Sequence, residues 1–301
     1  MSPGGTGART HARADAGTHA RAEVLVTPGA LAAALAGDEP PVLLDVRWVL
    51  GRDDGREQHL AGHLPGAVFV DLPTELSAPP TAEGGRHPLP DVAALEAAAR
   101  RWGVRAGRGV VAYDATGGLA AARAWWLLRW AGVRDVRLLD GGLAAWTAAG
   151  LPLEAGAVVP EPGDVVLSGG GLPTVDADGA AAWPTHGVLL DARAGERYRG
   201  ESEPVDPRAG HVPGALSAPT ADLLGPDGRF RPEAELRARL GPHADAGPVA
   251  VYCGSGVTAA HTVAALATLG VEAALYPGSW SQWSADAARP AATGARPGRP
   301  A

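Results

Sequence analysis

Four sequence blocks occur twice in this chain of 301 residues, in the same order each time. The motif Val-Leu-Leu-Asp-x-Arg stands at 42–47 and 188–193, and Ala-Gly-His-x-Pro-Gly-Ala stands at 61–67 and 209–215. A Val-rich run at 110–114 matches 249–253, and a Gly-initiated segment ending in Trp at 141–146 matches 278–283. Because all the blocks keep their order, the sequence predicts a duplicated domain.

Each copy alternates short apolar runs with longer helical patterns. In the first copy we expect strands at 42–46, 109–113 and 136–139, and helices at 91–102 and 119–131. This alternation predicts α/β domains, each a mainly parallel sheet flanked by helices. The predicted boundaries are a disordered tail at 1–22, a first domain at 23–150, a Gly- and Pro-rich linker at 151–173, a second domain at 174–287 and another tail at 288–301.

Charge and hydropathy exclude several classes of function. There are 26 basic and 33 acidic residues, giving a net charge of -7, which argues against a general nucleic-acid binder. No apolar run is long enough to span a membrane, and the first 21 residues lack the apolar stretch of a secretory signal. We therefore expect a cytoplasmic protein without nucleic-acid or membrane partners.

The chain has one cysteine, Cys253, at the end of a predicted buried strand. Alone it forms neither an internal disulfide nor a thiolate cage, so no metal is expected. It is followed by Gly254-Ser255-Gly256-Val257 and by a predicted helix that begins near Thr258. Loop N–H groups and the positive end of that helix favour an anion, which predicts a nucleophilic thiol. The alternative is a packed strand-end residue.

Two other chemistries of a strand–loop–helix cysteine fit poorly. A phosphatase needs an arginine that closes the loop, but the residue six positions after the cysteine is Ala259. A thiol hydrolase needs a histidine partner, and His261 lies within the predicted helix, where we expect it to point away.

The duplicated domain, the paired His-x-Pro-Gly-Ala blocks and the single cysteine loop resemble the tandem rhodanese-type sulfurtransferases. The loop Cys-Gly-Ser-Gly-Val-Thr at 253–258 resembles the 3-mercaptopyruvate branch, whereas the thiosulfate branch carries basic residues after the cysteine. This resemblance implies transfer of sulfur from 3-mercaptopyruvate to a thiol or to cyanide through a Cys253 persulfide, without a cofactor. The acceptor would be a reduced thioredoxin-like protein or a low-molecular-weight thiol. The alternatives are a thiosulfate donor, or persulfide delivery to a partner protein.

The resemblance also assigns site residues. Arg197 and Arg208 would bind the donor carboxylate and carbonyl, because a keto acid needs guanidinium groups set back from the sulfur. A relay would join Ser255 to His63 and to Asp54 or Asp53. His63 recurs as His211 in the second copy, so a structural role is the alternative reading.

The loop itself completes the expected site. Gly254 and Gly256 would permit a tight turn, with Val257 beside them, and Thr258 would cap the helix or donate to the sulfur. The first copy carries Asp114 at the position of the cysteine, followed by its own Gly-rich loop. We expect that domain to be catalytically silent, with Asp114 satisfying its own loop amides.

Overall fold

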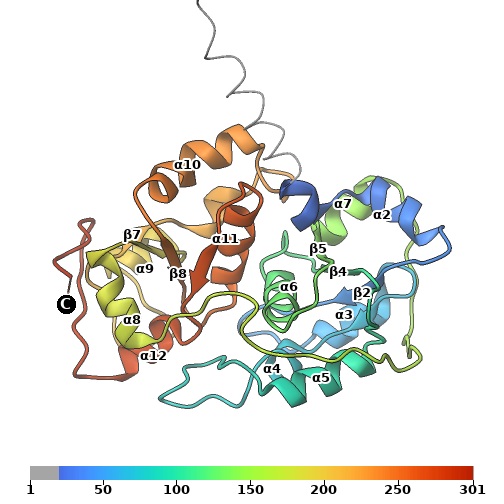
Figure 1. The fold of residues 1–301 in the computed structure, drawn as a ribbon, viewed down its shortest axis with the longest axis horizontal. Coiled ribbons are helices and arrows are strands. Elements are labelled where there is room, and N and C mark those ends of the chain that lie inside the picture. The colour runs from blue at the N-terminus through green and yellow to red at the C-terminus, as the bar shows by residue number, and fades with distance from the viewer. Residues whose placement is uncertain (1–19, 301) are drawn as a thin grey trace, which may run out of the picture.

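The computed structural model describes residues 20–300, which form two parallel β-sheets, one in each repeat (Figure 1). The strand orders are β1-β5-β4-β2-β3 and β7-β6-β8-β9. The first sheet contains β1 (Leu25–Val26), β2 (Val42–Asp45), β3 (Val68–Phe69), β4 (Val110–Tyr113) and β5 (Val136–Leu139); the second contains β6 (Val188–Asp191), β7 (Leu216–Ser217), β8 (Val249–Tyr252) and β9 (Ala273–Leu275).

Helices surround both sheets. The first domain has α2 (Pro28–Leu35), α3 (Gly55–Ala61), α4 (Leu72–Glu75), α5 (Val92–Arg101), α6 (Ala121–Trp130) and α7 (Gly142–Ala148). The second has α8 (Ala177–Ala182), α9 (Gly195–Arg199), α10 (Glu233–Asp245), α11 (Thr258–Ala267) and α12 (Ser279–Ala285), with the 3₁₀ turns η1 (Trp183–Thr185) and η2 (Thr220–Leu223).

The predicted fold class is confirmed. Strands β2, β4, β6 and β8 are buried along their whole length, which explains why they are almost continuously apolar. Helix α5 begins one residue after the predicted start at 91, because Asp91 is its cap: the Asp91 carboxylate accepts hydrogen bonds from the amides of Ala93 and Ala94.

One of the apolar clusters spans both domains. Helix α6 follows β4, helix α11 follows β8, and these two helices pack against each other between the sheets (Figure 1). A single cluster of buried residues includes Trp126 of the first domain and Leu266 of the second. The loops that connect each central strand to its helix therefore lie at the domain interface, at the carboxyl ends of the strands, where open α/β sheets bind ligands.

Both predicted tails need correction where they are described. Residues 20–22 are helical, and Arg21 donates hydrogen bonds to the carbonyl oxygens of Phe230 and Arg231. Residues 1–19 lie outside the described residues. The segment 288–300 is not a free tail, because Ala292 pairs with His211 through two backbone hydrogen bonds of 2.9 Å. Further along it, Pro297 accepts a hydrogen bond from the amide of Gly214.

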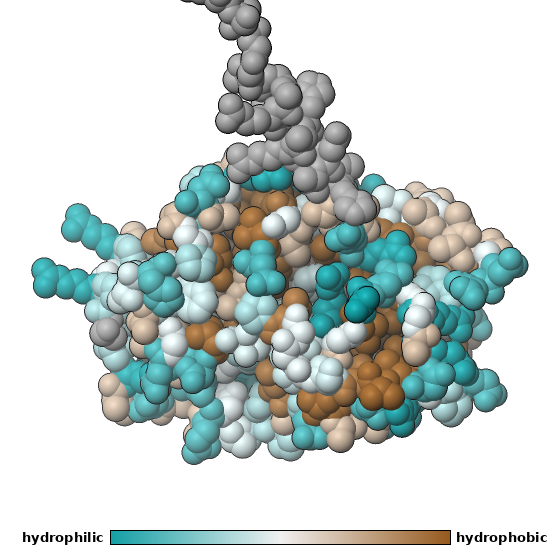
Figure 2. All heavy atoms as spheres, in the orientation of Figure 1, coloured by the Kyte–Doolittle hydropathy of each residue, from teal (hydrophilic) through white to brown (hydrophobic). Residues whose placement is uncertain are grey.

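No helix among residues 20–300 is long and apolar enough to cross a membrane. Hydrophilic side chains are spread over both domains on the face shown in Figure 2, with apolar residues between them.

Deleting residues 290–301 should destabilise the second domain. The deletion removes the backbone bonds that Ala292 makes to His211, the Gly294–Arg199 bond and the acceptor for Gly214. Several such bonds together contribute at least about 2 kcal/mol, so thermal unfolding should shift down by about 4 °C or more. An unchanged unfolding temperature would show that this segment contributes nothing to the fold.

Candidate active site

The cysteine sits where the central strand of the second sheet ends. Cys253 directly follows β8 and is 2% exposed. The amide of Gly256 donates to its sulfur at an N···Sγ distance of 3.2 Å, so the loop folds back over the thiol. An N–H donated to sulfur stabilises a thiolate relative to a thiol.

The two loop glycines are needed for different reasons. Gly256 has a φ of +75°, and a Cβ there would lie 2.5 Å from the carbonyl oxygen of Pro277, so both backbone conformation and space require glycine. Gly254 is not in the left-handed region. A Cβ there would instead lie 2.9 Å from Nη2 of Arg86 and 3.5 Å from Nη1 of Arg197. Gly254 therefore leaves room for two guanidinium groups beside the sulfur loop.

The first turn of α12 supports the cysteine loop through hydrogen bonds. The amides of Trp280 and Ser281 donate to the carbonyls of Cys253 and Gly254, at 3.0 and 2.8 Å. The Ser279 hydroxyl accepts from the Cys253 amide at 3.2 Å and donates to the carbonyl of Tyr276. Among the described non-glycine residues only Ser279 has a positive φ, +53°, a strained conformation that typically costs 1–3 kcal/mol, roughly. This strained residue fixes the backbone of the cysteine.

The first copy shows what such a loop binds. The carboxylate of Asp114 accepts four backbone N–H bonds from its own loop: Oδ1 from Thr116 and Gly118, Oδ2 from Ala120 and Ala121, at 2.7–3.0 Å. The preferred reading of Asp114, a carboxylate satisfying its own loop amides, is thereby confirmed. The same strand–loop–helix unit in the second copy presents a thiol instead of a carboxylate at this anion-binding position.

A buried arginine from the first domain lies against the cysteine loop. Arg123 of α6 is fully buried and donates to the carbonyl oxygens of Gly256, Leu76, His87 and Pro88. Burial lowers the pKa of Arg123 to about 10, an effect that the nearby Cys253 sulfur opposes, so the guanidinium is charged at neutral pH. Its hydrogen-bond acceptors among the described residues are all carbonyl oxygens, so its charge is not matched by a carboxylate there and would stabilise a thiolate at Cys253.

Ser255 meets a histidine, but not the predicted one. The Ser255 hydroxyl oxygen lies 2.7 Å from Nδ1 of His87, which reaches the loop from the first domain. Trp48 packs edge-on against the same imidazole. Burial, followed by the charges of Arg123 and Arg86, lowers the pKa of His87 to about 4. The imidazole is therefore neutral at neutral pH and is able to exchange a proton with the serine.

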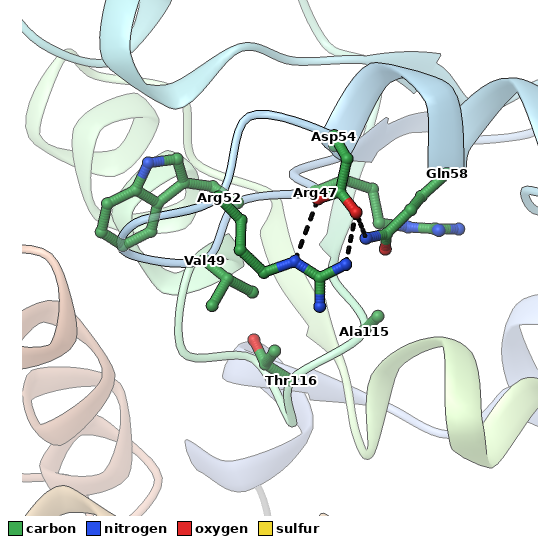
Figure 3. A pocket seen from close by; sticks show the side chains of 9 residues that line it. Arg47, Val49, Arg52, Asp54, Gln58, Ala115 and Thr116 are labelled. Atoms are coloured by element: carbon green, nitrogen blue, oxygen red, sulfur yellow. Dashed lines mark hydrogen bonds and ion pairs between the residues drawn. The ribbon is translucent and has the colours of Figure 1, made fainter.

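The predicted relay through His63 and Asp54 is wrong. His63 is fully buried, stacks on His59, and its ring nitrogens face the carbonyl oxygens of Leu64 and Gly156. The backbone of His63 pairs with that of Glu154, and the backbone of His211 pairs with that of Ala292 in the second copy. Both histidines therefore hold the segment that follows the last helix of their domain. Figure 3 shows Asp54 in a surface pocket of the first domain, where it binds Arg52 and Gln58.

Arg197 lies at the loop as predicted, but Arg208 does not. Arg208 donates to the carbonyls of Trp283, Ser284, Asp286 and Arg289 and thereby caps the end of α12. A guanidinium used in this way is not available to a substrate. Arg197 pairs with Glu203 and with Asp206, while the Asp206 carboxylate also pairs with Arg86 of the first domain.

The remaining predicted residues have simple outcomes. Val257 occupies the cap position of α11 and Thr258 is the first helical residue, so the Thr258 side chain does not cap the helix. His261 is buried, stacks on Phe230 and lies 2.8 Å from the hydroxyl of Thr220. It points away from Cys253, as expected.

Sequence reasoning missed Arg86, His87 and Arg123, which all come from the first domain. A comparison of the two copies contains the signal. Gly-Arg-His at 85–87 corresponds to Gly-Arg-Phe at 228–230, so the histidine is a difference between the copies. His63, in contrast, is repeated as His211. The difference at position 87 therefore indicates function, and the recurrence of His63 indicates structure. Arg86 is repeated as Arg229, so the comparison gives no such signal for it.

Comparison with known proteins agrees with this geometry. The Rhodanese-like domain family matches residues 27–149 and 177–286. A putative thiosulfate sulfurtransferase, SseB, from Mycobacterium tuberculosis is 49% identical and covers 91% of this chain and 99% of its own length. A probable 3-mercaptopyruvate sulfurtransferase from Pseudomonas aeruginosa is 48% identical, covering 90% and 98%. The crystal structure of SseA from Escherichia coli superposes with a TM-score of 0.74 at 34% identity, covering 85% and 98%.

The chain therefore belongs to the rhodanese-like family, as a tandem-domain sulfurtransferase. Both matched regions coincide with the two domains described above, and the cysteine lies in the second of them.

Replacing Arg123 by Met should slow the reaction of Cys253 with iodoacetamide at pH 7 by about tenfold, because the buried counter-charge is lost. The chain has a single cysteine, so incorporation of the label reports on this site alone. Arg123→Lys keeps the charge and should react faster than the Met variant. Equal rates for Met, Lys and wild type would remove Arg123 as the electrostatic partner of the thiol.

Proposed function

We propose that this sulfurtransferase takes sulfur from 3-mercaptopyruvate and passes it to a thiol through a persulfide on Cys253. The observation that carries the proposal is the juxtaposition at Gly254: a buried thiol in an anion-binding loop with neutral side chains, and guanidinium groups set back from it. A keto acid with its carboxylate remote from the reacting sulfur fits this arrangement. The name of the Pseudomonas aeruginosa relative agrees with it.

The first half-reaction follows from these groups. The Cys253 thiolate attacks the thiol sulfur of the donor, the sulfur–carbon bond breaks, and its electron pair passes to the carbon as an enolate. The proton of the donor thiol is transferred to that carbon, giving pyruvate and an enzyme persulfide. Ser255 and neutral His87, 2.7 Å apart, form the proton route that we propose for this transfer.

The second half-reaction restores the cysteine. An acceptor thiolate, or cyanide, attacks the outer sulfur, the S–S bond breaks, and the Cys253 thiolate leaves. The loop amide of Gly256 and the charge of Arg123 stabilise that leaving thiolate. We propose a low-molecular-weight thiol or a thioredoxin-like protein as acceptor, and a reducing, cytoplasmic location that would keep the single cysteine free.

Thiosulfate is the second candidate donor, favoured by the name of the Mycobacterium tuberculosis relative. It is a compact dianion that cationic side chains within the loop would hold, yet residues 254–258 carry no charge. We therefore expect a higher kcat/KM with 3-mercaptopyruvate than with thiosulfate, measured side by side with cyanide as acceptor. The opposite ranking would assign the protein to thiosulfate.

Cys253→Ser should abolish turnover with both donors, and retained turnover would exclude the persulfide.

Ser255→Ala should separate the two donors. It should lower kcat with 3-mercaptopyruvate by about 100-fold, because a thiol proton must move, and His87→Ala should do the same. Thiosulfate carries no such proton and releases sulfite, so its kcat should change little. His63→Asn is the comparison variant, because His63 has a structural role, and the property measured for it is its thermal unfolding temperature. Equal losses with both donors in Ser255→Ala would exclude a proton-transfer role.

A further inference from the structure

Backbone contacts fix the main chain of His87 beside the cysteine loop. Arg123 donates a hydrogen bond to the carbonyl oxygen of His87. The amide of the preceding residue, Arg86, donates to the hydroxyl of Ser281 in α12. These bonds place the backbone, but they do not set the rotation of the imidazole about its side-chain torsions. That rotation decides whether Nδ1 of His87 faces Ser255.

No carboxylate among residues 20–300 orients this imidazole. The ring has one hydrogen bond there, between Nδ1 and the hydroxyl of Ser255, and Nε2 has none. The charges that act with burial to lower the pKa of His87 are both cations, Arg123 and Arg86. A histidine that serves as a base is commonly oriented by a group bonded to its second ring nitrogen. Here another contact must hold the ring.

The imidazole packs against the indole of Trp48. The two ring centroids lie 5.3 Å apart and the ring planes meet at 88°, which is an edge-to-face arrangement. Trp48 lies three residues beyond the end of β2, is partly buried and packs against the apolar cluster that spans both domains. The indole is therefore held by the core. It restricts rotation of the imidazole without adding a charge beside it.

The two copies of the repeat differ at both members of this ring pair. Trp48 directly follows the motif Val-Leu-Leu-Asp-x-Arg, and the residue in the same place in the second copy is Ala194. His87 corresponds to Phe230 in the second copy. The copy that faces the cysteine loop therefore has both rings, and the copy that faces the silent loop has neither. Joint presence and joint absence indicate that the two rings act together.

We propose that Trp48 is a positioning residue that holds the imidazole of His87 toward Ser255 and takes the place of the carboxylate of a histidine relay. The proposal rests on the proposed function, because it concerns the proton route through Ser255. Trp48 itself transfers no proton. A carboxylate in its place would favour the imidazolium, whereas an indole leaves the ring uncharged between proton transfers.

Nuclear magnetic resonance tests the ring pair without any turnover. The ¹⁵N signals of the His87 ring are assigned by their loss in His87→Gln. In wild type they should show one uncharged tautomer between about pH 5 and about pH 8, because burial lowers the pKa of His87 to about 4. In Trp48→Ala the freed ring should exchange between tautomers, and its pKa should rise toward 6.5. Signals unchanged by Trp48→Ala would overturn the proposal.

Kinetics test the consequence for catalysis. With 3-mercaptopyruvate, Trp48→Ala should lower kcat about tenfold at nearly unchanged KM, the upper range for an aromatic pair. Trp48→Phe keeps an aromatic ring and should recover most of the loss, whereas Trp48→Leu keeps apolar bulk alone and should not. With thiosulfate, which carries no thiol proton, kcat should change little in all three variants. Equal recovery by Leu and Phe would reduce Trp48 to a packing residue.

A double variant and a matched control separate positioning from general damage. If the indole acts through the imidazole, adding Trp48→Ala to His87→Ala should cause no further loss of kcat, whereas independent losses would multiply. Trp183 of the second domain also packs on a histidine, His186, with ring centroids 5.2 Å apart. Trp183→Ala should leave kcat unchanged. A tenfold loss in Trp183→Ala, or multiplied losses in the double variant, would contradict the proposal.

The two kinds of experiment distinguish this proposal from the function on which it rests. If wild type does not turn over 3-mercaptopyruvate, the proposed function fails, and the ¹⁵N signals still decide whether Trp48 holds His87. If wild type turns over this donor and Trp48→Ala keeps the wild-type kcat, the positioning role fails and the proposed function stands.

Discussion

The contact on which the site depends is that of buried Arg123 with the loop of Cys253. A fully buried guanidinium is costly unless its charge and its donors are met. Here the donors are met by carbonyls from both domains, including that of Gly256, and the charge faces the sulfur. Packing of α6 on α11 is what brings the cation there. The domain interface therefore supplies the buried positive charge beside the thiol, in addition to the loop amide of Gly256 that the second domain provides.

Duplication explains how the site arose on a common scaffold. Each copy places a Gly-rich loop between its central strand and the following helix, and in the first copy that loop binds its own Asp114 carboxylate through four amides. In the second copy the residue at this position is Cys253, whose sulfur we propose as the carrier of the transferred atom. The helices that follow the two loops also differ. Helix α6 carries the cation Arg123, which reaches across the interface. Helix α11 carries His261 at the corresponding position, and burial lowers the pKa of His261 to about 4, so this side chain is neutral.

Much of the fold was predictable because it rests on local patterns. Apolar four-residue runs predicted the central strands, and the repeat predicted the second domain. The position of the cysteine loop was also predicted correctly. The pairing of side chains across the interface was not predictable from patterns of this kind. Ser255 contacts His87, which lies 168 positions away in the sequence, and the residues around each of them do not indicate this contact. The tail at 288–300 was misjudged because its order comes from backbone pairing with His211, which composition does not report.

The loop amide of Gly256 and the buried charge of Arg123 surround one atom, the Cys253 sulfur, and a persulfide on that atom is the intermediate they would serve. The most direct test is the intact mass of the protein after treatment with 3-mercaptopyruvate in the absence of an acceptor. Each wild-type chain should gain the mass of one sulfur atom, and Cys253→Ser should gain none. An unchanged wild-type mass, or the same gain in Cys253→Ser, would exclude the persulfide.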